Sequence, residues 1–213
     1  RGIMSVLIND DMDNLLKTTS RSFYPTLKYL PKKVRGQIGL LYLLARVADT
    51  IADSKHGETD LLLKSISEYN NVAQGKSAQL PDLTIIADIQ DNPNEAELLR
   101  NVADIVNALQ VYDKDDQARM LECLDIIVGG QILDLERFGP AKEGGKISAL
   151  KNNAEMDDYT FRVAGCVGVF WTKMSLAHLV KMDVERQEDF FEKGVRFGKA
   201  LQMINILLSL IHI

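Results

Sequence analysis

The stretch Ile38-Gly-Leu-Leu-Tyr-Leu-Leu-Ala-Arg-Val-Ala-Asp-Thr-Ile-Ala-Asp53 decides the fold class, because it predicts an apolar helix with one line of charge. Spacings of three and four residues place Tyr42, Arg46, Asp49 and Asp53 on one face of that helix. Two carboxylates on adjacent turns repel each other and are costly to desolvate unless a positive group lies between them. Mg²⁺ meets this need, because it takes oxygen ligands and is commonly held by one or two carboxylates together with substrate phosphates. The pattern therefore indicates a metal–diphosphate site.

A more ordinary interpretation of the same residues is a solvated helix face with an Arg46–Asp49 ion pair. Two aspartates four residues apart, taken alone, would favour that interpretation. Here the neighbouring Leu, Ile, Val and Ala residues favour a buried helix. We therefore keep the metal–diphosphate interpretation, with Asp49 and Asp53 as candidate metal ligands.

Length and composition indicate an ordinary globular domain. The 213 residues are 46% hydrophobic and 26% charged, which is enough for a sizeable core. The formal net charge of −5 argues against nucleic acid as the main partner. Cys123 and Cys166 match no metal-ligand spacing, so we interpret them as core thiols in a reducing compartment. With no apolar run of the roughly 18–20 residues that a membrane span needs, we expect a cytoplasmic protein, with peripheral membrane contact possible in principle.

Helical periodicity runs through the chain, with hardly any strand signal. The segment Asn92-Pro93-Asn94-Glu95 combines a cap, a first-turn proline and an acid at the third helical position, which together mark a helix start. Expected loops are Gly75 to Asp91 and Gly139 to Asn153. Expected helices run over Asp11 to Leu30, from Pro31 through the apolar stretch, over about Leu61 to Ala73, Pro93 to Val111, Asp115 to Phe138, Met156 to Met182, and from Val184 to the end. The sequence predicts an all-α single domain over residues 1–213.

The last expected helix carries a second polar face. From Ala200 onward it is apolar except for Gln202, Asn205, Ser209 and His212, which are spaced three, four and three residues apart. Satisfied core amides or an exposed stripe would be the ordinary interpretation. Beside the acidic helix, an inward-facing amide pair would instead form a wall of the same cavity.

Small residues gather on the helix before it, at Tyr159, Val163, Ala164, Gly165, Val167 and Gly168. Glycine in a helix interior costs roughly 1 kcal/mol relative to alanine. Two glycines three residues apart therefore suggest a purpose. Close helix packing is one such purpose, and room for a long hydrocarbon chain is the other.

Five segments resemble motifs of the squalene/phytoene synthase family, the head-to-head prenyltransferases, and they fall in the family's order. They are Ser20-Arg21-Ser22-Phe23-Tyr24 with Leu30-Pro31, Tyr42 to Asp53, Gly129-Gly-Gln-Ile-Leu-Asp134-Leu, Tyr159 to Gly168, and Ala200-Leu-Gln202-Met-Ile-Asn205-Ile-Leu. The resemblance extends from about Leu15 to Leu207. It implies an isoprenoid-synthase-type helical bundle around a central cavity.

By this resemblance the chain would be a Mg²⁺-dependent transferase that joins two farnesyl diphosphates through presqualene diphosphate to squalene or dehydrosqualene. NADPH would be required if the product is squalene. Thr50 looks more like the squalene branch, whereas a phytoene synthase using geranylgeranyl diphosphate is the alternative. A non-catalytic isoprenoid-diphosphate-binding helical protein is another. The Ser-Arg-Ser-Phe and Tyr159-to-Gly168 matches disfavour a head-to-tail prenyltransferase or terpene cyclase. Prenyl chain length, product and oligomeric state stay open at this point.

The resemblance also implies roles for individual residues. Mg²⁺ would be held by Asp49, Asp53 and Asn205. Catalytic residues would be these two aspartates, Arg46, and Tyr159, which would steer the rearrangement. Substrate-binding residues would be Ser20, Arg21, Ser22, Phe23, Tyr42, Arg46, Val163, Val167, Gln202 and Asn205.

The end of the sequence departs from the family pattern, which continues Arg-Asp-x-x-x-Asp after Leu207. Leu208 stands in place of the arginine, and Ser209 and Ile213 in place of the two aspartates. Our hypothesis is that residues 208–213 are a non-native end of a C-terminally truncated domain, and that residues 1–3 precede a natural start at Met4. We expect half a site, with one carboxylate pair and two arginines, and reduced or absent turnover.

Overall fold

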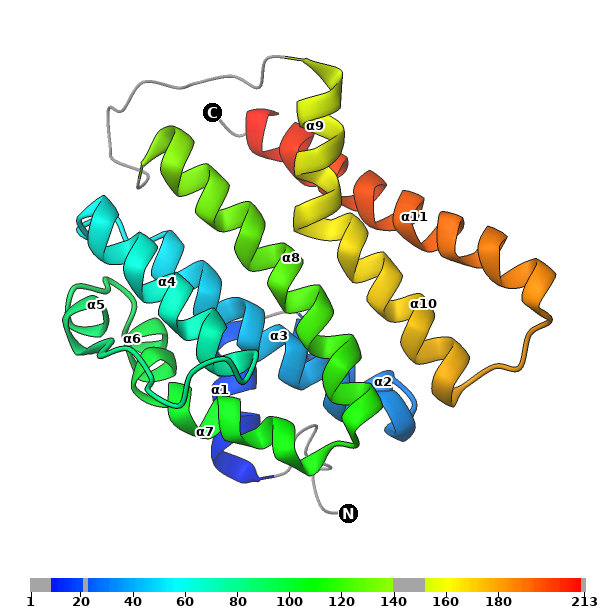
Figure 1. The fold of residues 1–213 in the computed structure, drawn as a ribbon, viewed down its shortest axis with the longest axis horizontal. Coiled ribbons are helices and arrows are strands. Elements are labelled where there is room, and N and C mark those ends of the chain that lie inside the picture. The colour runs from blue at the N-terminus through cyan, green and yellow to red at the C-terminus, as the bar shows by residue number, and fades with distance from the viewer. Residues whose placement is uncertain (1–8, 21–22, 140–151, 212–213) are drawn as a thin grey trace. The chain divides into compact units, whose positions relative to one another are not determined.

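The computed structural model describes residues 9–20, 23–139 and 152–211, and every regular element in these ranges is helical (Figure 1). This confirms the all-α fold. The chain divides into two compact units, Arg1–Gly145 and Lys146–Ile213, called here the N-terminal and C-terminal units. A single domain over residues 1–213 stays a prediction.

The N-terminal unit is built around one buried helix. Its elements are α1 (Asp10–Ser20), α2 (Phe23–Tyr29), α3 (Lys32–Ala52), α4 (Thr59–Ala73), α5 (Thr84–Asp88), α6 (Pro93–Arg100), α7 (Val102–Asn107), the 3₁₀ turn η1 (Ala108–Val111) and α8 (Lys114–Phe138). Helix α3 packs against α4 and α8, and these three lie side by side in Figure 1.

Leucines explain why α3 is buried. Leu40, Leu43 and Leu44 of α3 are fully buried, and each such side chain contributes roughly 1.5–3 kcal/mol by leaving water. The buried Tyr69 of α4 donates a hydrogen bond from its hydroxyl to the carbonyl oxygen of Leu44, at 2.8 Å. The apolar surroundings expected for the acidic stretch are therefore present.

Several expected boundaries were wrong. The expected Asp11-to-Leu30 helix corresponds to α1 and α2, which lie on either side of two residues outside the described ranges. Pro31 precedes α3 as an extended residue with ψ 136° and not as its first helical residue. The expected Gly75-to-Asp91 loop contains α5.

The expected Pro93-to-Val111 helix was also wrong as one element, since it is divided into α6, α7 and η1. The division falls at Asn101, whose side-chain amide donates to the carbonyl oxygen of Glu97 at 2.8 Å. Side-chain bonds of this kind compete with the backbone ladder of a helix.

The C-terminal unit contains α9 (Asn153–Thr160), the π-helical turn η2 (Phe161–Gly165), α10 (Cys166–His178) and α11 (Val184–Ile211). The expected Met156-to-Met182 helix is thus three elements and ends at His178. Helices α10 and α11 pack against each other with very close backbones. A Cβ atom on Gly168 would lie 2.0 Å from the carbonyl oxygen of Gly194. Close helix packing is therefore one purpose of the small residues.

Among the helices that the structure describes, none combines the length and apolar character needed to cross a membrane.

Candidate functional site

The acidic face of α3 lies at the C-terminal end of that helix. Asp49 is half-buried, and Asp53 is an exposed residue just after the last turn, where its backbone N–H donates to the carbonyl oxygen of Asp49. Carboxylates at this end of a helix meet the negative end of the helix dipole, which is unfavourable. Their placement therefore does not serve the stability of the helix.

Two other helices of the same unit reach this face. Arg46 forms an ion pair with Glu95 of α6. Asp49 accepts a hydrogen bond from the side-chain amide of Gln131 of α8. Asp134 lies three residues further along α8, and its carboxylate interacts electrostatically with that of Asp53. The ordinary interpretation was an Arg46–Asp49 ion pair. In the structure Arg46 instead pairs with Glu95 of α6, and Asp49 bonds Gln131 of α8.

The electrostatics of the face disfavour ionised carboxylates. Burial raises the pKa of Asp49 to about 6, and the charge of Asp53 adds to this while Arg46 opposes it. Partial desolvation raises the pKa of Asp53 although that residue keeps exposed surface; Arg46 opposes this rise and Glu95 adds to it. Burial also raises the pKa of Asp134. A cation bound here would relieve the cost of ionising these groups.

The donor atoms present fit a hard cation such as Mg²⁺. Besides the carboxylates of Asp49 and Asp53, the face holds the buried Oε1 atom of Gln131, which has no hydrogen-bond partner within the described residues. Across those same residues, no group of three or more His, Cys, Asp or Glu side chains is arranged to hold a metal ion alone. A cation would have to complete its shell with water and with oxygens of a bound ligand, as Mg²⁺ commonly does.

Replacing Asp49 by asparagine should stabilise the metal-free protein at neutral pH. The pKa of Asp49 in the folded state lies above its ordinary value of 3.8, so a protonated Asp49 favours the folded state. The contribution of Asp49 to the free energy of unfolding therefore becomes less favourable as pH rises from 3.8 through about 6. At pH 7 the ionised Asp49 lowers the free energy of unfolding by at most about 3 kcal/mol. Denaturant unfolding in EDTA should show the variant more stable at pH 7 and similar to the wild type near pH 4. A stability difference that does not change with pH would contradict the electrostatic explanation.

The first motif lies where α1, α2 and α3 meet. The hydroxyl of Tyr42 donates to the carbonyl oxygen of Thr19 at 3.3 Å, next to the buried Ser20. The ring of Phe23 lies 5.0 Å from that of Tyr42, tilted by 31°. The structure thus brings Ser20, Phe23 and Tyr42 together, whereas the predicted Arg21 and Ser22 lie outside the described residues.

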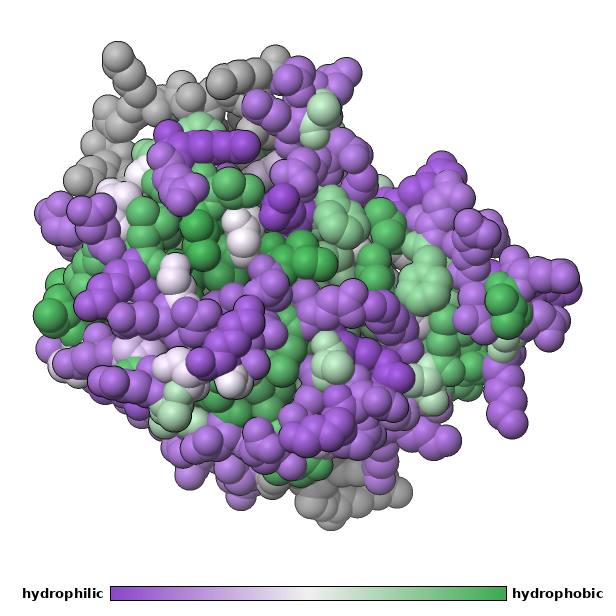
Figure 2. All heavy atoms as spheres, viewed as in Figure 1, coloured by the Kyte–Doolittle hydropathy of each residue, from purple (hydrophilic) through white to green (hydrophobic). Residues whose placement is uncertain are grey.

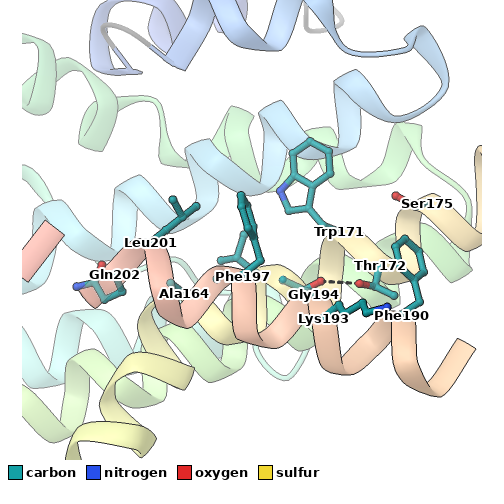
Figure 3. A pocket seen from close by; sticks show the side chains of 13 residues that line it. Ala164, Trp171, Thr172, Ser175, Phe190, Lys193, Gly194, Phe197, Leu201 and Gln202 are labelled. Carbon is teal, nitrogen blue, oxygen red and sulfur yellow. Dashed lines mark hydrogen bonds between the residues drawn. The ribbon is translucent and has the colours of Figure 1, made fainter. Parts of the chain in front are cut away.

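The C-terminal unit has an apolar pocket of about 610 Å³ beside α10 and α11. This volume is within the range of small-molecule sites. In Figure 3 the side chains of Trp171, Phe197 and Leu201 point to the same side of the helix pair, and Figure 2 shows green apolar surface along these helices. The pocket is lined by Ala164, Val167, Gly168, Trp171, Thr172, Ser175, Phe190, Lys193, Gly194, Phe197, Gly198, Leu201 and Gln202.

Two predicted substrate-binding residues, Val167 and Gln202, line this pocket. Val163 does not, and it is 37% exposed on the π-helical turn η2. Tyr159 is half-buried in α9, directly before that turn. Asn205 lies in α11, but its side chain is outside the described part of the structure. The π-helical turn, a feature often found at functional sites, was not expected from the sequence.

Three residues of the site, Glu95, Gln131 and Asp134, were not predicted from the sequence. Gln131 and Asp134 lie inside the family-like segment Gly129 to Leu135. Their spacing of three residues places them on one face of α8, and this pattern could have indicated that they belong to the site. Glu95 was noticed only as an acid at a helix start. Nothing local in its sequence indicates a partner in α3.

Most of the chain matches a known family. Residues 16–211 match the family model described as squalene/phytoene synthase. The chain belongs to the squalene/phytoene synthase family. The match includes both the acidic face of α3 and the pocket residues of α10 and α11.

Individual members of the squalene/phytoene synthase family are only distantly similar. A bifunctional lycopene cyclase/phytoene synthase of Blakeslea trispora is 20% identical over 198 residues, which are 93% of this chain and 30% of that protein. Solved structures of TcSQS with the ligands E5700 and BPH1237 have TM-scores of 0.70 and 0.68, each at 19% identity. They cover 92% and 93% of this chain and 53% of the TcSQS chain, so this chain spans about half the length of those proteins or less. At this identity the structural matches establish the fold.

Proposed function

We propose that this family member takes part in the head-to-head condensation of two farnesyl diphosphates through presqualene diphosphate to squalene or dehydrosqualene. The observation that carries the proposal is the Asp49–Asp53 pair at the end of a buried helix, with raised pKa values and with Arg46 beside it. Few stabilising roles explain such a costly arrangement, whereas binding a metal–diphosphate does.

The family resemblance implies a role for each of several side chains, and their chemistry is compatible with these roles. Asp49 and Asp53 would hold Mg²⁺, which when bound would neutralise charge on the leaving diphosphate. Asn205 is a further metal ligand only by the family resemblance. Arg46, Arg21 and Ser20 would donate hydrogen bonds to diphosphate oxygens. Tyr159 would steer the rearrangement.

An apolar lining is needed around the prenyl chain, because water would quench an allylic cation. The pocket with Val167, Trp171 and Phe197 would take part of that chain. By the resemblance, Phe23, Tyr42 and Val163 would also contact prenyl substrate.

Two alternatives to farnesyl diphosphate condensation are each supported by a specific observation. The Blakeslea trispora relative is named in part as a phytoene synthase, which favours geranylgeranyl diphosphate as substrate. Leu208, Ser209 and Ile213, in place of charged family residues, favour a non-catalytic isoprenoid-diphosphate-binding protein. NADPH use belongs to the squalene alternative, and a cytoplasmic location with membrane contact stays a prediction.

Incubation with either prenyl diphosphate and Mg²⁺, with and without NADPH, tests the proposal by mass spectrometry of the extracted products. We expect presqualene diphosphate, squalene or dehydrosqualene from farnesyl diphosphate, and none when EDTA replaces Mg²⁺. Phytoene from geranylgeranyl diphosphate would favour the first alternative. Tight Mg²⁺-dependent binding without product would favour the second, and neither binding nor product would contradict all three.

A further inference from the structure

Glu95 holds the guanidinium that the proposed function assigns to diphosphate. Nη2 of Arg46 donates to Oε1 of Glu95, and the two side chains are only 30% and 23% exposed. The Nε atom of Arg46 is buried and has no hydrogen-bond partner within the described residues. One guanidinium thus has a carboxylate partner on one nitrogen and an unused donor on another.

Glu95 is held in place by the start of its own helix. The side chain of Asn92 accepts a hydrogen bond from the backbone N–H of Asn94 at 3.0 Å, and Pro93 opens α6. This cap fixes the first turn, in which Glu95 lies. The carboxylate is therefore presented to α3 from a capped first helical turn.

Arg46 lies among three carboxylates, because its charge acts on both Asp49 and Asp53 while Glu95 is its ion-pair partner. A carboxylate and a phosphate group both bind the planar donor fork of arginine. Glu95 and a diphosphate would therefore compete for the same guanidinium.

We propose that in the ligand-free protein the Glu95 carboxylate accepts the hydrogen bond of Arg46 that diphosphate would otherwise accept. When diphosphate binds, its oxygens replace the Glu95 carboxylate as the partner of Arg46. This rests on the proposed function, in which Arg46 binds diphosphate. Glu95 then acts as a positioning residue with two effects. It keeps Arg46 from forming ion pairs with Asp49 and Asp53. It also lowers the affinity of Arg46 for diphosphate, and this lower affinity assists release of the pyrophosphate product.

Calorimetry with inorganic pyrophosphate in excess Mg²⁺ tests this exchange. Glu95→Gln should bind pyrophosphate about three- to tenfold more tightly than the wild type, since a partly exposed ion pair no longer has to be broken. Glu97→Gln is the matched control, because it removes the same charge from an exposed position of the same helix that bonds Asn101 instead of Arg46. We expect no comparable change there.

Arg46→Gln should weaken pyrophosphate binding, and in that background most of the gain from Glu95→Gln should disappear, as a double-mutant cycle would show. Glu95→Ala, with circular dichroism as a folding check, provides a second variant of the same position.

Three outcomes would overturn the inference. Unchanged or weaker binding by both Glu95 variants, with Arg46→Gln still harmful, would remove it and leave the proposed function standing. An equal gain in Glu97→Gln would reduce the effect to general charge. A wild type that does not bind pyrophosphate with Mg²⁺ would overturn both the inference and the proposed function.

Discussion

Asp53→Asn is expected to weaken the Mg²⁺-dependent binding of a non-hydrolysable farnesyl diphosphate analogue by ~10²-fold or more. Residues that merely support metal ligands already contribute about 10–100-fold to metal affinity, so a direct ligand should contribute at least as much. Calorimetry of the wild type and the variant, each with Mg²⁺ and with EDTA, measures the effect. A titration with Mg²⁺ alone should be weak in both, because the cation relies on diphosphate oxygens to complete its shell.

A matched control separates this effect from a general loss of negative charge. Asp104→Asn alters an exposed aspartate of α7 in the same unit, and it should leave analogue binding unchanged. Equal analogue affinity with and without metal in the wild type would refute the assignment of Asp49 and Asp53 as metal ligands.

Gly168→Ala is expected to destabilise the C-terminal unit by ~3 kcal/mol, at the upper end of typical overpacking costs. The new methyl group would lie 2.0 Å from the carbonyl oxygen of Gly194, and backbone atoms of a packed helix cannot move aside cheaply. Denaturant unfolding followed by the fluorescence of Trp171 measures the effect. Trp171 is the single tryptophan of the chain and lies in the C-terminal unit, so it reports on that unit.

Gly165→Ala provides the comparison for this prediction. Its new methyl group would meet the ring of Phe161 at 2.8 Å, and a side chain can rotate away. The alanine also gains roughly 1 kcal/mol of helix propensity, so the net change should be small. Similar unfolding midpoints for the two variants would show that α10 and α11 can separate without cost.

Local patterns determined the helical class and much of the candidate site. Apolar periodicity predicted α3 and α8, and the cap at Asn92 predicted the start of α6, because these features depend on neighbours within one or two turns. The breaks at Asn101 and at η2 were missed. They depend on side-chain and backbone bonds that periodicity does not contain.

The sequence by itself determined that Arg46, Asp49 and Asp53 share one face of an apolar helix, since a spacing of three or four residues is enough to fix that. Only the tertiary structure decided which groups meet them. Arg46 pairs with a residue 49 positions away, and Asp49 bonds one 82 positions away. Such contacts arise from the packing of α3 against α6 and α8, where burial and charge act between segments that are distant in sequence.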